Sequence, residues 1–488
     1  MTTNKRLALR GGYLTAYLPL LIFLFFCILF FVIMKAFEMH ALAMGAILGL
    51  MAGALLVKPG HSESYWEAVY QGAREAIPVV VLLLVIGMFS QMIKVANLSA
   101  GFVYLAESLG VTGGLYTGVT FLFVAIIATA TGSSIGSFFT CFPIFYPAGL
   151  LLGAHPAALA GAILSGGVFG DNLAPISDTT IISAGTQYFK KSQRPSDVGG
   201  AVRSRLPYSL IAGSLSFILF VILGGGGEVA TSGQVLTHTG QDLLPLIMLI
   251  PVAVMLIVSV RSHNLYLAIS LGLVVGTVLG LASGILLPSD ILANQDGHLT
   301  GYLTDGINGM MGTCILVLSV YGIMGVLDAA GALDQLTQNL YQSRLCQTVA
   351  GTELAMMIGI TVTTILFGGV SSASMTTFGK VQNELGQRAG LHPYRRANLL
   401  DGFANGLGVA VPFLSVFIFV GSQLTQGYDF VQPLSVTQIA PYLFHSYGLF
   451  LVFLGSILTG IGRRYEGPNG KEVKELVELQ SVEGEAVG

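Results

Sequence analysis

The sequence predicts an all-α polytopic membrane protein built from an inverted repeat with broken helices. Three observations lead to this fold class. The 488 residues are 53% hydrophobic and 10% charged, with a mean hydropathy of +0.77, a balance typical of proteins with many membrane spans. The stretch from Ser165 to Ala184 places two aspartates and a proline in an otherwise apolar segment. A similar stretch with its own proline, Pro412, recurs in the second half.

Composition and motifs exclude several other classes. The net charge of −3 argues against a nucleic-acid partner. The four cysteines are scattered, without the spacing of a metal site or a disulfide framework. The chain has no HExxH motif, nucleophile elbow or phosphate-binding loop. An intramembrane aspartyl protease is disfavoured because residues 168–171 read VFGD rather than GxGD. We therefore expect a protein that is not an enzyme and needs no cofactor.

Apolar runs of about 17 to 25 residues mark the expected spans. The first run follows Lys5, Arg6 and Arg10 and is longer than a signal-peptide core, so we expect a retained span. The two longest segments exceed one straight helix, and each contains a central proline. The predicted segments are residues 13–34, 39–57, 76–93, 113–131, 136–152, 156–187, 207–223, 243–260, 264–287, 308–327, 350–368, 371–386, 397–425 and 441–461.

Positive charge gives the expected orientation. With the N-terminus in the cytoplasm, nearly all of the 22 Lys and Arg fall on inner connections or segment ends. These inner charges include Arg205, Arg395 and Arg396. The outer stretches 224–241, 288–306 and 426–440 contain no Lys or Arg. We therefore expect both termini in the cytoplasm.

Pro175 is expected to break the helix that contains Asp171. Proline has no N–H and its ring clashes with the carbonyl four residues earlier, so the Asp171 carbonyl should be free. Ser177 or Asp178 can cap a new half-helix that begins at Thr179. Such a break presents carbonyls and carboxylates to a cation at mid-membrane. The alternative is a kink whose polar groups satisfy one another, although two carboxylates in one span are costly without a function.

The segment around Pro175 belongs to an internal repeat. GAHPAALAGAILSGGVFGDNLAPISD from Gly153 aligns without gaps with GLHPYRRANLLDGFANGLGVAVPFLS from Gly390, which pairs Pro175 with Pro412. Basic residues flank the start of the second copy but not of the first, so the copies should cross the membrane in opposite directions. Inverted repeats with broken helices are typical of secondary transporters that work by alternating access.

The repeat divides the chain into predicted parts. These are N-terminal spans (1–75), transport repeat A (76–206), connecting spans (207–307), the inverted transport repeat B (308–440), a final span (441–462) and a polar, partly helical cytoplasmic tail (463–488).

Two serine-rich turns also correspond between the repeats. With a shift of one residue, Ser133 and Ser134 align with Ser371 and Ser372. Both turns lack charged residues, so they are either tips of re-entrant hairpins within the membrane or ordinary loops. The acidic residues differ between the copies, because the second repeat carries Asp401 with Asn405 before its break. The predicted site is therefore asymmetric.

The motif GDNLAPISDTT, from Gly170 to Thr180, resembles the signature of the NhaC family of sodium/proton antiporters, and the two serine turns fit the same pattern. The likeness extends from about Ile77 to Tyr465. It implies coupling of Na⁺ to H⁺, with Asp171 and Asp178 as carriers, in a plasma membrane of the bacterial inner-membrane type. One departure is that Pro412 is followed by Phe-Leu-Ser, where cation exchangers of the family tend to carry Trp and Asn. Some relatives move organic solutes instead.

Two hypotheses of function follow. The first is sodium/proton antiport by alternating access, in which the carboxylates of the broken helix bind Na⁺ or H⁺. The second is Na⁺- or H⁺-coupled transport of a small organic anion or amino acid. The expected partners are membrane lipid and the two ions, with an organic solute and a homodimer left open. The candidate site residues are Asp171, Asn172, Ser177, Asp178, Thr179, Thr180, Ser133, Ser134, Ser371, Ser372, Asp401 and Asn405, with Asp171 and Asp178 as the Na⁺ ligands.

Overall fold

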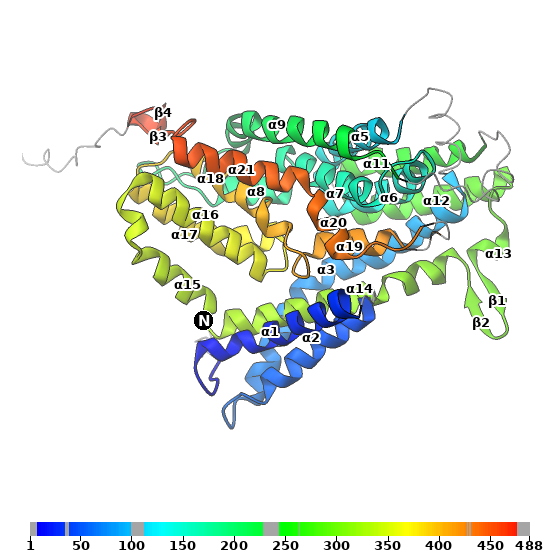
Figure 1. Cartoon of the computed structure of the whole chain (residues 1–488), viewed down its shortest axis with the longest axis horizontal. Helices are drawn as coiled ribbons and strands as arrows, with labels where there is room; N and C mark the ends of the chain where they lie inside the picture. The colour runs from blue at the N-terminus through cyan, green and yellow to red at the C-terminus, as the bar shows by residue number, and fades with distance from the viewer. Residues whose placement is uncertain are drawn as a thin grey trace, which may run out of the picture.

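The computed structural model describes residues 7–34, 39–98, 112–227, 244–262, 264–426, 428 and 431–475. In this part of the chain nearly all regular structure is helical (Figure 1). Eight helices are long and apolar enough to cross a membrane, or up to ten if each of two bent helix pairs is one span. The predicted all-α polytopic membrane fold is confirmed.

The first helices pack against a long helix from the middle of the chain. α1 (Leu18–Cys27) lies between 3-10 and π segments at Tyr13–Tyr17 and Ile28–Ile33, and α2 (Met39–Ala54) and α3 (Ser62–Val95) follow. In Figure 1, α1 and α2 lie beside α14 (Tyr302–Ala329). α3 and α14 approach closely because Gly87 meets Gly306 and Gly72 meets Gly325. Small residues permit such close packing of helices in membranes.

Five helices of the first half surround the first break. They are α5 (Gly113–Thr131), α6 (Ser134–Leu151), α7 (Pro156–Leu173), α8 (Asp178–Gly185) and α9 (Val198–Leu223). α7 begins with Pro156 in its first turn, and the His155 ring accepts the Ala158 N–H at 3.3 Å. α7 and α8 are bent by 42° at their break.

The connecting region holds two apolar helices and a small hairpin. A 3-10 segment at Leu244–Met248 leads into α11 (Leu249–Ser262), which is followed by α12 (Leu265–Ser283) and α13 (Pro288–Ile291). Strands β1 (Ala293–Gln295) and β2 (His298–Thr300) then pair across a turn with positive φ at Asp296 and Gly297. The sequence reading missed this hairpin, although Asp-Gly is a strong turn signal.

The second half repeats the helix order of the first. α15 (Ala332–Tyr341) and a 3-10 segment at Arg344–Gln347 precede α16 (Val349–Leu366), α17 (Ser371–Arg388), α18 (Pro393–Ala404) and α19 (Val416–Leu424). Both ends of α17 lie 237 residues after the ends of α6, the same offset that pairs the two prolines. Helix starts therefore pair Ser134 with Ser371, without the one-residue shift that the sequence suggested.

α7 and α18 begin at opposite ends of the last long helix. α20 (Val436–Ile439) and a 3-10 segment at Ala440–Tyr442 lead into α21 (Phe444–Thr459). The His155 ring at the start of α7 lies 5.2 Å from the ring of Tyr442. The His392 N–H at the start of α18 donates to the Arg464 carbonyl at 2.9 Å. An inverted repeat requires this antiparallel arrangement of α7 and α18. The inverted repeat itself and the division into domains stay predictions.

Three predicted boundaries cut through helices. The divisions after residues 75, 206 and 307 fall inside α3, α9 and α14, because apolar runs mark the lipid-exposed stretch of a helix and not its polar ends. The tail also differs from the expected partial helix. β3 (Tyr465–Glu466) and β4 (Glu472–Val473) form a hairpin around a 3-10 turn at Pro468–Gly470, while residues 476–488 lie outside the described part.

Three arginines that the charge pattern placed on inner connections or segment ends are inside the protein. Arg205 and Arg396 are 0% exposed and Arg395 is 2% exposed. Arg205 pairs with Asp401 and Arg395 with Glu353. These charges neutralise internal carboxylates and do not report the orientation of a loop, so the cytoplasmic termini stay a prediction.

Candidate functional site

The helix is broken at Pro175 as predicted, but the carbonyl that the break frees belongs to Asn172 and not to Asp171. The Ala174 N–H donates to the carbonyls of both Gly170 (2.9 Å) and Asp171 (3.3 Å), so the Asp171 carbonyl is not left free. The Asn172 carbonyl instead accepts from the Arg205 Nη1 at 2.7 Å. The end of α7 is therefore satisfied by an arginine from α9.

Asp171 and Asp178 occupy opposite ends of this break. Asp171 is buried, and its Oδ1 accepts the hydroxyl of Ser177 at 2.6 Å. Asp178 is exposed, and its Oδ1 accepts the N–H of Thr179 at 2.9 Å. Ser177 holds the N-cap position of α8 but makes no capping bond, because its hydroxyl is turned toward Asp171. The two carboxyl groups are close enough to interact electrostatically.

The serine turns reach the same place. Gly132 lies against Ile176 and Ser177, within the first break. The side chain of Ser134 interacts with Asp171, and that of Ser372 interacts with Asp178. Ser133 instead caps its own helix, accepting the Gly136 N–H at 3.1 Å. Whether these turns are re-entrant tips within the membrane stays a prediction.

Asp401 enters the site from α18 and is fully engaged. Its Oδ1 accepts from the side-chain amides of Asn172 (2.6 Å) and Asn405 (2.8 Å). Its Oδ2 accepts from the Ser183 hydroxyl (2.9 Å) and forms an ion pair with Arg205 Nη1 (2.6 Å). Asp401 therefore joins the first repeat to the second and has its charge matched by Arg205.

The second break is longer than the first. The sequence predicted that Pro412 would free the carbonyl of Gly408, but α18 already ends at Ala404. Glycine weakens a helix, and Gly406 and Gly408 follow this end, which lets the chain leave the helix early. The helix resumes at Val416, where the Ser415 hydroxyl caps the Ile418 N–H at 3.4 Å.

The second serine turn also packs on its own break. Gly369 lies against Ser415, and the Gly368 carbonyl accepts the Val416 N–H at 2.8 Å. The Ser371 hydroxyl donates to the side-chain oxygen of Asn405 at 2.8 Å. In each half, therefore, a serine turn braces the break that follows it in sequence.

The structure thus brings most of the predicted site residues around the two breaks, with Ser133 directed to its helix. Sequence reasoning missed Arg205, Ser183 and Ser209, whose hydroxyl donates to the Asn172 side chain at 2.5 Å. An arginine in a largely apolar helix is itself a signal, since charges within spans are rare and functional.

Among the described residues, no group of three or more His, Cys, Asp or Glu could hold a metal ion. A Na⁺ ion bound at the breaks would therefore need hydroxyl or carbonyl oxygens as ligands in addition to two carboxylates.

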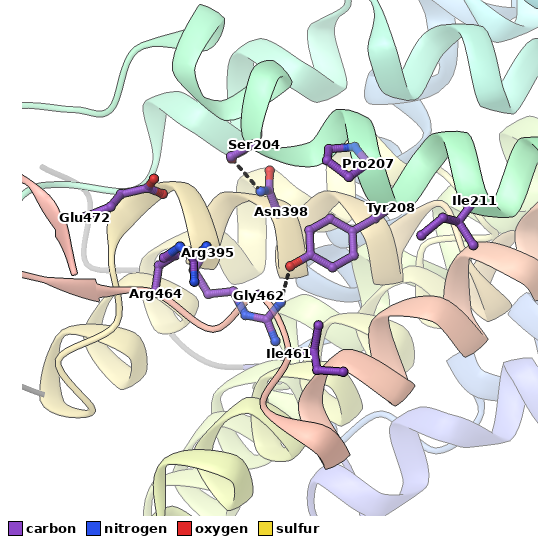
Figure 2. Close-up of a pocket in the computed structure, with 10 residues that line it drawn as sticks. All are labelled: Ser204, Pro207, Tyr208, Ile211, Arg395, Asn398, Ile461, Gly462, Arg464 and Glu472. Atoms are coloured by element: carbon purple, nitrogen blue, oxygen red, sulfur yellow. Dashed lines mark hydrogen bonds between the residues drawn. The ribbon is translucent and has the colours of Figure 1, made fainter. Parts of the chain in front are cut away.

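A pocket of about 450 Å³ lies beside the ion pair, between α9, α18 and the chain after α21 (Figure 2). Asn398 lines it and donates to the Ser204 hydroxyl at 2.7 Å. The side-chain oxygen of Asn398 accepts from Arg205 Nε at 3.4 Å. Asn398 therefore separates this pocket from the buried guanidinium. Arg395, Arg464 and Tyr208 also line the pocket.

His392 caps the start of α18, as His155 caps α7. Its Nδ1 accepts the Tyr394 N–H at 3.2 Å, and its Nε2 lies 3.1 Å from the Gly470 carbonyl. Burial lowers the pKa of His392 to about 4. The ring is therefore neutral near pH 7, which suits a cap that accepts a hydrogen bond.

Known proteins resemble the chain along most of its length. A model described as the Na⁺/H⁺ antiporter family matches residues 5–225 and 198–456. An uncharacterised Na⁺/H⁺ antiporter of Haemophilus influenzae is 24% identical over 413 residues, which cover 80% of this chain and 86% of that protein.

Two further relatives have more specific names. The malate-2H⁺/Na⁺-lactate antiporter of Bacillus subtilis is 24% identical over 363 residues, covering 71% of this chain and 75% of the relative. The Na⁺/H⁺ antiporter NhaC of Alkalihalophilus pseudofirmus is 27% identical over 241 residues, covering 45% of this chain and 50% of the relative.

Proposed function

Because the chain belongs to the NhaC-type Na⁺/H⁺ antiporter family, we propose that it exchanges Na⁺ for H⁺. In this proposal, Asp171 and Asp178 are the carboxylates that bind either ion. It is an antiporter of the secondary-transport class and not an enzyme. Its family likeness supports a location in the plasma membrane, and the Lys and Arg that remain on its loops support termini on the cytoplasmic side.

The observation that carries this proposal is the difference between the carboxylates. Asp401 has four partners, including the guanidinium of Arg205. Asp171 and Asp178 form no ion pair with any described residue, and their hydrogen-bond partners are neutral: the hydroxyls of Ser177 and Ser134 for Asp171, and the Thr179 N–H and the Ser372 hydroxyl for Asp178. A carboxylate without a resident cation is available to Na⁺ or H⁺.

The break supplies the remaining ligands and the route to exchange. Hydroxyl oxygens of Ser177 and Thr179 lie 2.8 Å apart beside the two carboxylates, and neutral oxygens of this kind complement carboxylates around a hard cation. A carboxylate that coordinates Na⁺ cannot carry a proton at the same oxygen, so the two ions compete. Competition at one site, exposed alternately to each side, produces antiport.

Proteoliposome flux of ²²Na⁺ driven by a proton gradient tests the proposal. Asp171→Asn and Asp178→Asn should each give folded protein with coupled flux reduced at least tenfold, since an amide keeps the shape but cannot exchange a proton. The apparent Na⁺ affinity of the wild type should fall as the pH is lowered. Asp296→Asn, in the turn between β1 and β2, is the matched control. Wild-type flux in both site variants would place the coupling site elsewhere.

Coupled transport of an organic anion is the second candidate. Two observations favour it: Pro412 is followed by Phe-Leu-Ser, and one relative is named for malate and lactate. Flux measured with a panel of carboxylates, with and without Na⁺, separates the two functions. A solute whose uptake requires the Na⁺ gradient and is lost in Asp171→Asn would support this alternative.

A further inference from the structure

Arg205 carries a charge at a position where a charge is costly. It lies in α9, a largely apolar helix of 26 residues, and is 0% exposed. A buried cation without compensation destabilises a protein by several kcal/mol, whereas a paired one can be nearly neutral. A residue of this kind within a span usually has a functional task.

The guanidinium joins four helices at one point. Besides the Asn172 carbonyl on α7 and the Asp401 carboxylate on α18, Arg205 Nη2 donates to the Ser183 hydroxyl on α8 at 3.1 Å. Its Nε donates to Asn398, which also belongs to α18. The planar, branched donor set of arginine can serve these acceptors together, which a lysine ammonium cannot do.

These contacts also distinguish Asp401 from the other two carboxylates of the site. Arg205 and Asp401 cancel each other's charge, and amides and a hydroxyl satisfy the remaining positions around Asp401. Asp171 also lies within electrostatic range of Arg205. The field that a bound cation experiences therefore depends on this neutral pair remaining intact.

We propose that Arg205 is a positioning residue that acts as a resident cation: it holds Asp401 out of the transport cycle and keeps the end of α7 against α18. Asp171 and Asp178 are then the carboxylates of the site that bind transported cations. This inference rests on the proposed function, because it concerns the same site.

The other buried arginines do not duplicate this role. Arg395 binds Glu353, and Arg396 binds Asn383 and the Tyr188 carbonyl, while Lys380 on α17 is exposed. Arg205 is thus the buried cation of the described residues that contacts both broken segments.

A charge cycle tests the inference through the KM for Na⁺ in proteoliposomes. Arg205→Met leaves Asp401 as an extra anion, so KM should fall and kcat should fall with it as release slows. Asp401→Asn leaves Arg205 as an extra cation, so KM should rise. A unit charge acting over about 10 Å at an effective dielectric of about 20 changes affinity by roughly tenfold. The double variant is neutral again, and its KM should return to within about threefold of wild type.

Two further variants complete the design. Arg205→Lys keeps the charge but not the branched contacts, so its KM should stay near the wild-type value while kcat falls. Arg203→Met, an exposed position on the same helix, should change neither. If Arg205→Met and Asp401→Asn fail to fold, the test rests on the double variant and on Arg205→Lys, which both keep the net charge of the site. A tenfold change of KM in either of these two variants overturns the inference.

The outcomes separate this inference from the proposed function. Single variants that shift KM in the same direction, or a double variant that does not restore it, would show that Arg205 only holds the fold. A wild-type protein without Na⁺-coupled flux would overturn the proposed function, and the inference with it.

Discussion

Removal of Glu353 should destabilise the second half of the protein by about 3 kcal/mol. This carboxylate is 0% exposed and bridges two arginines: Oε1 accepts from Arg395 Nε at 2.7 Å, and Oε2 accepts from Arg463 Nε at 2.9 Å and Nη2 at 2.7 Å. The Arg463 side chain is 16% exposed and can turn to water, whereas that of Arg395 is 1% exposed and cannot. Glu353→Ala therefore leaves the buried Arg395 guanidinium without a carboxylate partner, although it keeps its hydrogen bond to Ser456, which places the cost near the lower end of about 3 to 5 kcal/mol.

The assay is thermal inactivation of purified protein, followed by size-exclusion chromatography, because membrane proteins of this size often unfold irreversibly. Glu353→Ala should lower the apparent melting temperature by several degrees. A Glu353→Met, Arg395→Met double variant should recover most of this loss, since it removes both buried charges. The control is Glu63→Ala, an exposed acidic residue in the first turn of α3. A single variant that melts within one degree of wild type, or a double variant as unstable as the single, would refute the reasoning.

Three further predictions concern orientation, pH and affinity. In a Cys346→Ser background, cysteines at Ser192 and Gln432, both exposed, should be labelled from opposite sides of the membrane, with Ser192 labelled from the cytoplasm; labelling of both from one side would contradict the inverted repeat. Burial holds the pKa of His392 at about 4, below the unfolded value near 6.5, so its contribution to stability should be lost as the pH falls from about 6.5 to 4. His392→Asn keeps a capping oxygen and should flatten this loss in pH-dependent melting curves; an unchanged slope would assign the loss to other groups. Ser134→Ala and Ser372→Ala should raise the KM for Na⁺ about three- to tenfold, the loss of one hydrogen bond of about 1 kcal/mol, without reducing the yield of folded protein; an unchanged KM would make these turns purely structural.

Local physics made much of the fold predictable from the sequence. Apolar runs locate the helices because lipid requires every backbone group to be bonded within the segment. Pro175 marks the first break because its missing N–H removes a helical hydrogen bond to a carbonyl only a few residues earlier. The starts of α7 and α18 follow from Pro156 and Pro393, since proline favours the first turn of a helix.

The remainder depends on contacts between distant segments. Arg205 could be counted as a loop charge because its partner, Asp401, lies in the other half of the chain. Pro412 could not show where α18 ends, since Asn405 leaves the helix several residues earlier and is held there by Ser371 and Asp401. Which carboxylate is paired with an arginine therefore follows from the tertiary structure.

The hairpin of β3 and β4 has a consequence for biogenesis. Its Glu466 side chain accepts the Lys190 N–H at 2.8 Å, and its Glu466 N–H donates to the Gly390 carbonyl at 2.9 Å. The connection after α8 and the turn before α18 are thus fastened by a hairpin that comes after both of them in the chain. Both attachments need Glu466, which is translated after α8 and α18, so neither can form until translation has passed this hairpin.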